Sequence, residues 1–382
     1  MISLIFAAPW LILLTYLALR LRLPRKLGPE GVDAEDAPLV SVIIPARNEE
    51  HNILSSAESV GASTYPNFEL IVVDDRSTDR TAQVARTAEM GKAARYEVLS
   101  GAELPEGWLG KPWACAQGAR EARGDILLFT DADTTHHPEL LGRAVADLQS
   151  GGADALTLLG RQIMLTFWEK IVQPQIFFSL ALGFPDLRTT PGPKRWRRAL
   201  ANGQYIMIHR AVYDEIGGHV AVKGEVVEDQ RLAQILCKAG KRIDIRLAED
   251  HFATRMYSSL PAMIEGWSKN VALASRQSFE SWFAPVALPS LIAVVVLLWI
   301  VPPVVVVLDL AGFSVGVPAA TAQAVTVGSA LFWFACAWRF GAPPWFGLLY
   351  PLGAAVEAYI FTRSLVKGRR VEWKGRTYVV PK

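Results

Sequence analysis

The sequence is short of cysteine and of net charge. Its 382 residues include three cysteines, which lie far apart and form no CxxC pair. This spacing predicts neither a zinc site nor a disulfide framework, and a reduced compartment is the simpler interpretation. A formal net charge of only +2 argues against a broad nucleic-acid-binding surface. The first predicted strand-to-helix turn also lacks the GxGxxG pattern, which disfavours an NAD-dependent enzyme.

Long uncharged apolar runs are abundant, by contrast. Hydrophobic residues make up 51% of the chain, and the mean hydropathy is +0.23. Residues 2–19 form one such run, and a basic cluster follows it at Arg20, Arg22, Arg25 and Lys26. A signal peptide would carry its basic residues before the run and a small-residue cleavage site after it. We therefore predict that residues 1–22 form an N-terminal transmembrane anchor whose basic end stays in the cytoplasm.

Three further apolar stretches follow near the C-terminus, at residues 282–308, 310–338 and 340–356. Each can supply the roughly 20 residues of a spanning helix. Three spans would place the tail and the globular domain on opposite sides of the membrane, whereas the basic residues of the tail favour the cytoplasm. A break at Pro302–Pro303 or Pro343–Pro344 could therefore make one stretch re-entrant. The number of spans stays open at two or three.

The predicted organisation is an anchor, a globular domain over residues 38–281, a membrane region over residues 282–366 and a basic tail over residues 367–382. The expected location is the cell (inner) membrane. The chain would be a multi-pass protein with its catalytic domain facing the cytoplasm.

The globular domain alternates strands and helices. Continuous apolar strands are predicted at residues 39–45 and 69–75, near 96–100, and from Asp125 into Asp131. Helices are predicted over residues 46–60 and 76–88, the second with Ser77, Thr78 or Asp79 as N-cap. The pattern predicts an α/β fold with a doubly wound, mostly parallel sheet.

Polar residues gather where these strands end, at residues 45–49, Asp74–Asp75 and 131–133. Ligands of such sheets lie beyond the carboxyl ends of the strands, so the three groups should share one crevice. Asp131 and Asp133 would repel each other unless a cation lay between them. Oxygen ligands suit Mg²⁺ or Mn²⁺. The alternative is that Asp131 caps a helix beginning near His137 and that Asp133 is merely solvated.

Three motifs in this order, SVIIPARNEE, IVVDDRSTDRT and FTDAD, resemble the family 2 glycosyltransferases with the GT-A fold. The resemblance covers about residues 39–277 and implies inverting, metal-dependent sugar transfer from a nucleotide sugar, with a UDP-sugar as the expected donor. It implies that Asp75 binds the base and that Asp131 and Asp133 hold the metal and the diphosphate, Asp133 as the direct ligand. The implied nucleotide pocket is lined by Pro45, Ala46, Arg47, Glu49 and Asp74.

The acceptor hydroxyl needs a general base. Glu228 and Asp229, in VVEDQRLAQ, are predicted to open a helix whose dipole favours carboxylates. By the resemblance, Asp229 is the base and Glu228 a supporting group; an acidic helix terminus without chemistry is the alternative. In EGWLGKPWACAQGA, Lys111 could place a cation beside the donor diphosphate, or be an exposed loop lysine.

The chain lacks the QxxRW motif of processive polysaccharide synthases and has GWSKN at residues 266–270 instead. With the GWLGKPWA segment, the apolar C-terminal runs and the terminal VEWKGRTY, this looks most like ceramide glucosyltransferase-like, hopanoid-associated and carotenoid glycosyltransferases. The resemblance implies transfer of a hexose to the hydroxyl or carboxyl group of a membrane lipid. A polysaccharide-elongating synthase and a non-catalytic membrane scaffold that retains the fold stay open as alternatives. The sugar and the lipid are left open.

Overall fold

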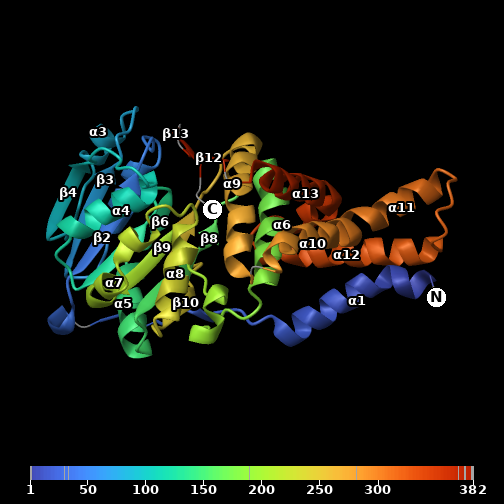
Figure 1. Cartoon of the computed structure of the whole chain (residues 1–382), viewed down its shortest axis with the longest axis horizontal. Coiled ribbons are helices and arrows are strands. Elements are labelled where there is room, and N and C mark those ends of the chain that lie inside the picture. The colour runs from blue at the N-terminus through green and yellow to red at the C-terminus, as the bar shows by residue number, and fades with distance from the viewer. Residues whose placement is uncertain are drawn as a thin grey trace. The chain divides into compact units, whose positions relative to one another are not determined.

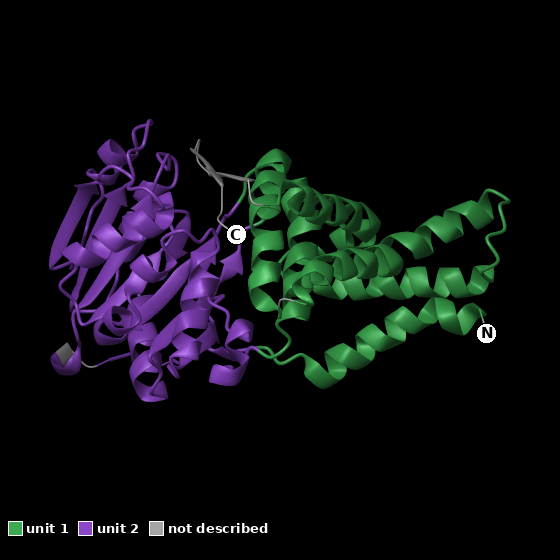
Figure 2. Cartoon of the chain, in the orientation of Figure 1, with its two compact units in different colours: residues 1–23, 164–186, 257–368 green, residues 24–163, 187–256, 369–382 purple. Residues whose placement is uncertain are grey.

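The computed structural model describes residues 2–29, 31–32, 34–188, 190–280, 282–368, 370–373 and 376–379. The chain divides into two compact units (Figure 2). The helical unit comprises residues 1–23, 164–186 and 257–368, and the sheet unit comprises residues 24–163, 187–256 and 369–382. This grouping differs from the expected continuous domain over residues 38–281, because residues 164–186 and 257–281 belong to the helical unit.

The sheet unit is built on one eight-stranded sheet (Figure 1). Only β9, among its described strands, runs antiparallel to its neighbours, so the predicted mostly parallel sheet is confirmed. The four predicted strands are all present. In spatial order the strands are β1 (Arg25–Lys26), β10 (Ile243–Leu247), β7 (Ala155–Leu159), β9 (Tyr205–His209), β5 (Ile126–Thr130), β2 (Val40–Ala46), β3 (Phe68–Asp74) and β4 (Arg95–Ser100).

Helices cover both faces of this sheet (Figure 1). Because strand side chains alternate between faces, Val42 and Ile44 pack in one core and Ile43 in the other. The first core includes residues of α2 (Ile53–Gly61), α3 (Thr81–Ala85) and α5 (Leu140–Gly151). The second includes residues of α4 (Gly110–Glu121), α7 (Arg210–Glu215) and α8 (Glu228–Lys238). The doubly wound arrangement is therefore confirmed.

The first two helices begin later than predicted, α2 at Ile53 and α3 at Thr81. The loops before them interlock, since Asn48 N donates to Ser77 Oγ at 3.0 Å and Thr78 N donates to Asn48 Oδ1 at 2.8 Å. Asn48 and Arg76 also adopt φ values of 52° and 55°, a left-handed conformation that cannot continue a right-handed helix. The N-cap residue of α3 is Arg80, so the prediction of Ser77, Thr78 or Asp79 as the N-cap is wrong.

A small second sheet follows the residues 131–133. It contains β6 (Thr134–His136), β11 (Phe252–Thr254) and β8 (Arg161–Gln162), with β11 antiparallel to β6 and parallel to β8. Three 3₁₀ helices, η1 (Ala34–Asp36), η2 (Pro193–Arg198) and η3 (Gly218–Val222), complete this part of the unit. In the predicted basic tail, β12 (Arg370–Trp373) and β13 (Arg376–Val379) pair antiparallel. Lys374 and Lys382 of that tail lie outside the described residues.

The helical unit contains the predicted apolar runs. Within the described ranges, three helices are long and apolar enough to cross a membrane: Ile2–Arg20, Ala284–Leu310 and Ala319–Arg339. The first is α1 and the third is α12. The second consists of α10 (Ala284–Val295), the π-helical turn η4 (Val296–Ile300) and α11 (Val301–Leu310). The other helices are α6 (Phe167–Gly183), α9 (Leu260–Ser278), η5 (Pro344–Leu349) and α13 (Tyr350–Lys367).

The two proline pairs behave differently. Pro302–Pro303 lies inside the continuous helix Ala284–Leu310, at the start of α11 and just after the π-helical turn η4. At Pro343–Pro344 the chain does break, because α12 ends at Arg339 and a 3₁₀ helix begins at Pro344. The structure therefore shows the break that the sequence allowed at Pro343–Pro344, and the number of spans stays a prediction.

Candidate active site

Lys111 holds together carboxylates from two other elements. Its Nζ lies 2.8 Å from Asp131 Oδ1, beyond β5, and 3.0 Å from Glu228 Oε1, at the start of α8. Burial alone would lower the pKa of Lys111, but Asp131, Glu228 and Asp229 raise it well above its usual value. Lys111 lies in the first turn of α4 with 24% of its side chain exposed, so the exposed-loop alternative is wrong.

Asp133 is a buried carboxylate in an electronegative setting. Its buried Oδ1 makes no hydrogen bond within the described part of the chain. Burial raises the pKa of Asp133 to about 7, and the charges of Asp131 and Glu49 add to that shift. Asp133 is thus not simply solvated, and Asp131 does not cap α5, whose N-cap residue is Glu139. The cluster of carboxylate oxygens fits a hard divalent cation such as Mg²⁺ or Mn²⁺.

Asp229 is held by two backbone groups. Its Oδ2 accepts a hydrogen bond from Gly203 N at 2.8 Å, and its Oδ1 accepts one from Gln230 N at 2.8 Å. Burial raises the pKa of Asp229 to about 6, and the neighbouring Glu228 contributes. The carboxylate is therefore oriented, largely ionised near neutral pH, and more basic than an exposed aspartate.

The turn at residues 202–204 positions this aspartate. Asn202 N donates to Thr157 Oγ1 at 2.9 Å, and Asn202 Nδ2 donates to Leu158 O at 2.8 Å. A Cβ atom at position 203 would lie 2.7 Å from Asp229 Oδ2. Glycine is required there because the backbone approaches the carboxylate so closely, a contact between residues that no short motif reveals.

The predicted nucleotide-pocket residues lie at the joined ends of β2 and β3. Pro45 and Ala46 pair with Val73 and Asp74, and Asp75 N donates to Ala46 O at 2.8 Å. Arg47 Nη1 donates to the carbonyl oxygens of Asp75 at 2.5 Å and Arg76 at 2.9 Å. Arg47 therefore supports the backbone that carries Asp75, which is 1% exposed.

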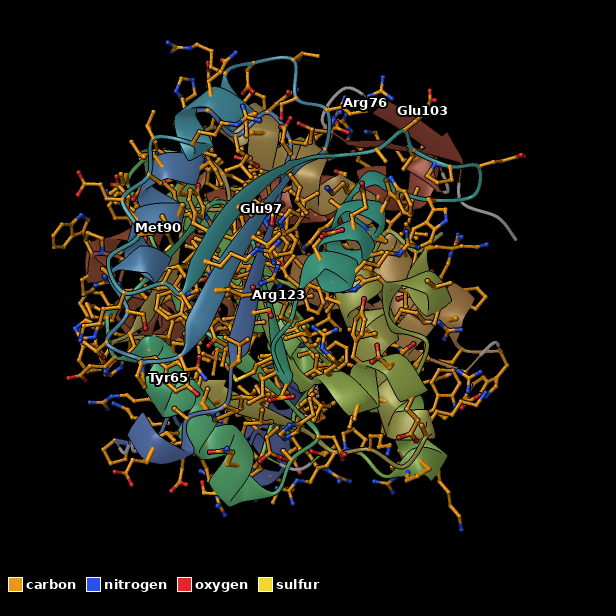
Figure 3. The ribbon with its side chains drawn as sticks, turned by 90° about the vertical axis from the view of Figure 1, so that its left-hand side faces the viewer. Tyr65, Arg76, Met90, Glu97, Glu103 and Arg123 are labelled. Carbon is orange, nitrogen blue, oxygen red and sulfur yellow. The ribbon has the colours of Figure 1, made fainter. Side chains whose placement is uncertain are left out.

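The connection after β4 packs against the same strand ends. Gly101 N donates to Asp74 O at 2.8 Å, and a Cβ atom at position 101 would lie 2.7 Å from that carbonyl oxygen. Arg76 and Glu103, with their charged atoms 3.7 Å apart, lie close together at this end of the sheet (Figure 3). Gly101 was not predicted; a glycine directly after a strand was the available signal.

The sheet unit thus brings the predicted residues into two adjoining groups. Lys111, Asp131, Glu228 and Asp229 interact electrostatically in one, and Asp133 joins them through Asp131. The strand-end group of residues 45–49 and 74–75 joins them through Glu49, which acts on Asp133.

Known proteins resemble this chain in sequence and in fold. Residues 41–217 match the sequence profile described as glycosyl transferase family 2. These residues form a family 2 glycosyl transferase domain. It contains the strand-end motifs and Gly203, and Glu228 and Asp229 follow it in the same sheet unit.

Two curated relatives carry the name 4,4'-diaponeurosporenoate glycosyltransferase. The one from Staphylococcus haemolyticus is 29% identical over 64% of this chain and 64% of its own length. The one from Staphylococcus aureus (strain USA300) is 27% identical over 61% of this chain and 60% of its own length. The chain therefore spans less than two thirds of the length of the relatives it matches.

One solved structure is similar in fold to this chain over nearly its whole length. The mannosyltransferase of Pyrobaculum calidifontis, solved in complex with GDP-Man and Mn²⁺, aligns with a TM-score of 0.55 at 19% identity. The alignment covers 96% of this chain and 97% of that protein. The expected GT-A fold is confirmed.

Proposed function

We propose that this chain transfers a hexose, with inversion, from a nucleotide sugar to the hydroxyl or carboxyl group of a membrane lipid. The observation that carries the proposal is the bridge made by Lys111. The lysine contacts Asp131 on the donor side at 2.8 Å and Glu228, beside the base candidate Asp229, at 3.0 Å. Charge neutralisation and proton acceptance would thus be available in one site.

On the donor side, Asp131 and Asp133 would hold a divalent cation, Mg²⁺ or Mn²⁺. Such an ion stabilises the negative charge that develops on a departing nucleoside diphosphate. The buried Oδ1 of Asp133, which has no hydrogen-bond partner among the described residues, supports this assignment, as does the Mn²⁺ complex of the mannosyltransferase of similar fold. The residues 45–47, with Glu49 and Asp74, would line the nucleotide pocket. Asp75 would bind the base of a UDP-sugar.

On the acceptor side, Asp229 would accept the proton of the attacking hydroxyl group. The N–H groups of Gly203 and Gln230 orient its carboxylate. A pKa of about 6 leaves the carboxylate ionised at neutral pH and still able to take up a proton. A base that activates the acceptor hydroxyl suits direct displacement, which inverts the anomeric carbon. Glu228, fixed by Lys111, would support the base.

The lipid acceptor is supported by two observations. The curated relatives are named for a carotenoid acid, 4,4'-diaponeurosporenoate. The chain also contains three helices, among the described residues, that are apolar and long enough to span a bilayer. A soluble acceptor would not require them. We place the protein in the cell membrane as a multi-pass protein whose sheet unit faces the cytoplasm, because the basic cluster after α1 favours that side.

The test is mass spectrometry of total lipids from three strains of the native host. The first carries the intact gene, the second an Asp229→Asn copy and the third an Asp214→Asn copy. Asp214 is an exposed residue of α7 and gives a control with the same chemical change. A lipid one hexose heavier than its precursor should be present with the intact gene and with Asp214→Asn, and absent with Asp229→Asn. That precursor would then name the acceptor.

Donor binding separates the possible failures. Purified Asp229→Asn protein should bind a UDP-sugar with Mn²⁺ as the intact protein does, because the base is not a donor ligand in the proposal. If the intact gene and the Asp229→Asn copy give the same lipid profile, while the protein binds the donor and the intact gene yields a polymeric product, the protein is a polysaccharide synthase. No donor binding by any form would indicate a scaffold that has only retained the fold.

A further inference from the structure

A second cluster of metal-ligating side chains lies apart from the candidate active site. One ligand atom each from His137, Glu139 and His251 can be chosen so that all three lie within 4.8 Å of one another. The two imidazole rings are 5.1 Å apart and nearly perpendicular, at 85°. His251 Nε2 lies 3.9 Å from Glu139 Oε2.

The backbone holds the two histidines together. His137 lies between β6 and α5, and His251 lies between β10 and β11. His137 N donates to His251 O at 2.8 Å, beside the pairing of β6 with β11. The proximity of the rings therefore rests on a hydrogen-bonded backbone and not on two free side chains that happen to meet.

Glu139 is oriented from its other side by Arg143. The guanidinium of Arg143 contacts only one carboxylate oxygen, Glu139 Oε2, through Nη2 at 2.6 Å and Nε at 3.1 Å. Both of these hydrogen bonds go to Oε2, which leaves Oε1 as the oxygen that would ligate an ion. A carboxylate that is hydrogen-bonded through one oxygen and ligates through the other is a common arrangement at metal sites.

Ligation by His137 would compete with a weak hydrogen bond. His137 Nδ1 accepts a long hydrogen bond from Glu139 N, at 3.3 Å. Ligation through that nitrogen would replace this weak bond, so its loss costs little.

We propose that His137, Glu139 and His251 bind a divalent transition-metal ion of the zinc class. Two nitrogen ligands and one carboxylate favour Zn²⁺ over Mg²⁺, which prefers oxygen. Tetrahedral coordination at about 2.0–2.1 Å would draw the three ligand atoms closer than they are now. His137 and Glu139 are exposed, so their side chains are able to make that adjustment.

The ion would act on the segment that carries Asp131 and Asp133. That segment runs directly into β6, which pairs with β11 through Phe252 and His136. An ion shared by His137 and His251 would join the two strands at one end of this pairing. Its expected effect is therefore to stabilise the sheet unit around the candidate donor site, without taking part in the reaction.

The experiment uses the detergent-solubilised full chain without a histidine tag, stripped with chelator and then titrated with Zn²⁺ alone. Excess Mg²⁺ is included to occupy the carboxylate site. The intact protein should bind one Zn²⁺ per chain at this site, and Co²⁺ in its place should show the absorption bands of a nitrogen-ligated ion. The double variant H137A/H251A should lose both signals, and Glu139→Gln should weaken binding at least ~10-fold.

His51→Ala is the matched control, because His51 is an exposed histidine beside a glutamate, with 87% of its side chain exposed. This variant should bind Zn²⁺ as the intact protein does. Zn²⁺ should also raise the thermal midpoint of the intact protein and of His51→Ala, but not that of the double variant. Equal Zn²⁺ binding by the double variant, or no binding by the intact protein at micromolar Zn²⁺, would overturn the proposal. Neither result depends on glycosyl transfer.

Discussion

Gly203→Ala tests the candidate base without altering any side chain of the candidate site. The added Cβ atom would lie 2.7 Å from Asp229 Oδ2 and 3.1 Å from its Cγ. The backbone of Gly203 lies outside the left-handed region, so alanine brings no conformational strain of its own. The contact is therefore relieved by movement of the Asp229 carboxylate or of the turn at residues 202–204.

The size of this movement sets the expected effect. A carbon–oxygen contact of ~3.4 Å is comfortable, so the two groups must separate by about 0.7 Å. A misplacement of ~1 Å in a catalytic group can reduce the rate about 100-fold. We expect kcat to fall by about 10- to 100-fold, which corresponds to about 1.4–2.7 kcal/mol in the activation barrier. The KM for the donor should change little, because the metal and nucleotide residues are untouched.

The assay is release of nucleoside diphosphate from the donor in the presence of acceptor lipid, with Gly192→Ala as control. Gly192 also belongs to the sheet unit, and an added Cβ atom there would have no heavy atom within 4 Å. The control should retain full activity. If Gly203→Ala folds with the thermal midpoint of the control and keeps kcat within twofold, the position assigned to the base is wrong.

Four other perturbations have expected outcomes. Asp133→Asn should abolish the effect of Mn²⁺ on donor affinity, measured by titration with and without the ion; an unchanged Mn²⁺ effect would exclude Asp133 as a ligand. Because Asp229 must be ionised and its pKa is raised to about 6, kcat/KM should fall about tenfold per pH unit well below pH 6. Lys111 lowers the pKa of Asp229, so Lys111→Met should move this fall to higher pH, and a profile that stays in place would contradict the bridge. Glu69→Gln should destabilise the protein by about 2–3 kcal/mol, because Glu69 is 2% exposed and accepts hydrogen bonds from Ser41 Oγ and Arg123 N, both at 2.6 Å. Burial alone would raise the pKa of Glu69, but these bonds and Arg95 lower it, so its contribution is present above the unfolded pKa and is lost as the pH falls through the folded one. Thermal unfolding, with Glu103→Gln as the surface control, measures this effect; equal midpoints would refute it.

The strands could be predicted from the sequence because each is a continuous apolar run, as buried parallel strands are. Val40–Ala46 and Phe68–Asp74 lie within about one residue of the prediction. The starts of the next helices could not be predicted, because they depend on contacts between the loops after β2 and β3. Asn48 and Thr78, for example, are 30 residues apart in the chain. Asn48 and Arg76 adopt the left-handed backbone conformation that glycine usually indicates, so the sequence held no glycine to mark these turns.

The candidate site was predictable where topology alone decides it. Parallel strands end at the same edge, so Asp75 and Asp133 were expected near each other from their places after two strands. The side-chain partners were not predictable in the same way. Asp229 meets Gly203 across 26 residues of chain, and that contact depends on how β9 and α8 pack. The same holds for Gly101, whose only role is to let two backbone segments approach.

The contacts of Lys111 explain why donor binding should require a metal ion. In the sheet unit, Lys111 faces Asp131, Glu228 and Asp229, and Asp133 feels both Asp131 and Glu49. Burial is the main cause of the raised pKa values of Asp133 and Asp229, and the charges of the neighbouring carboxylates add to it. A donor diphosphate adds further negative charge, so it is repelled until a divalent cation enters with it. We therefore expect metal and donor each to increase the affinity for the other by the same factor, as thermodynamic linkage requires.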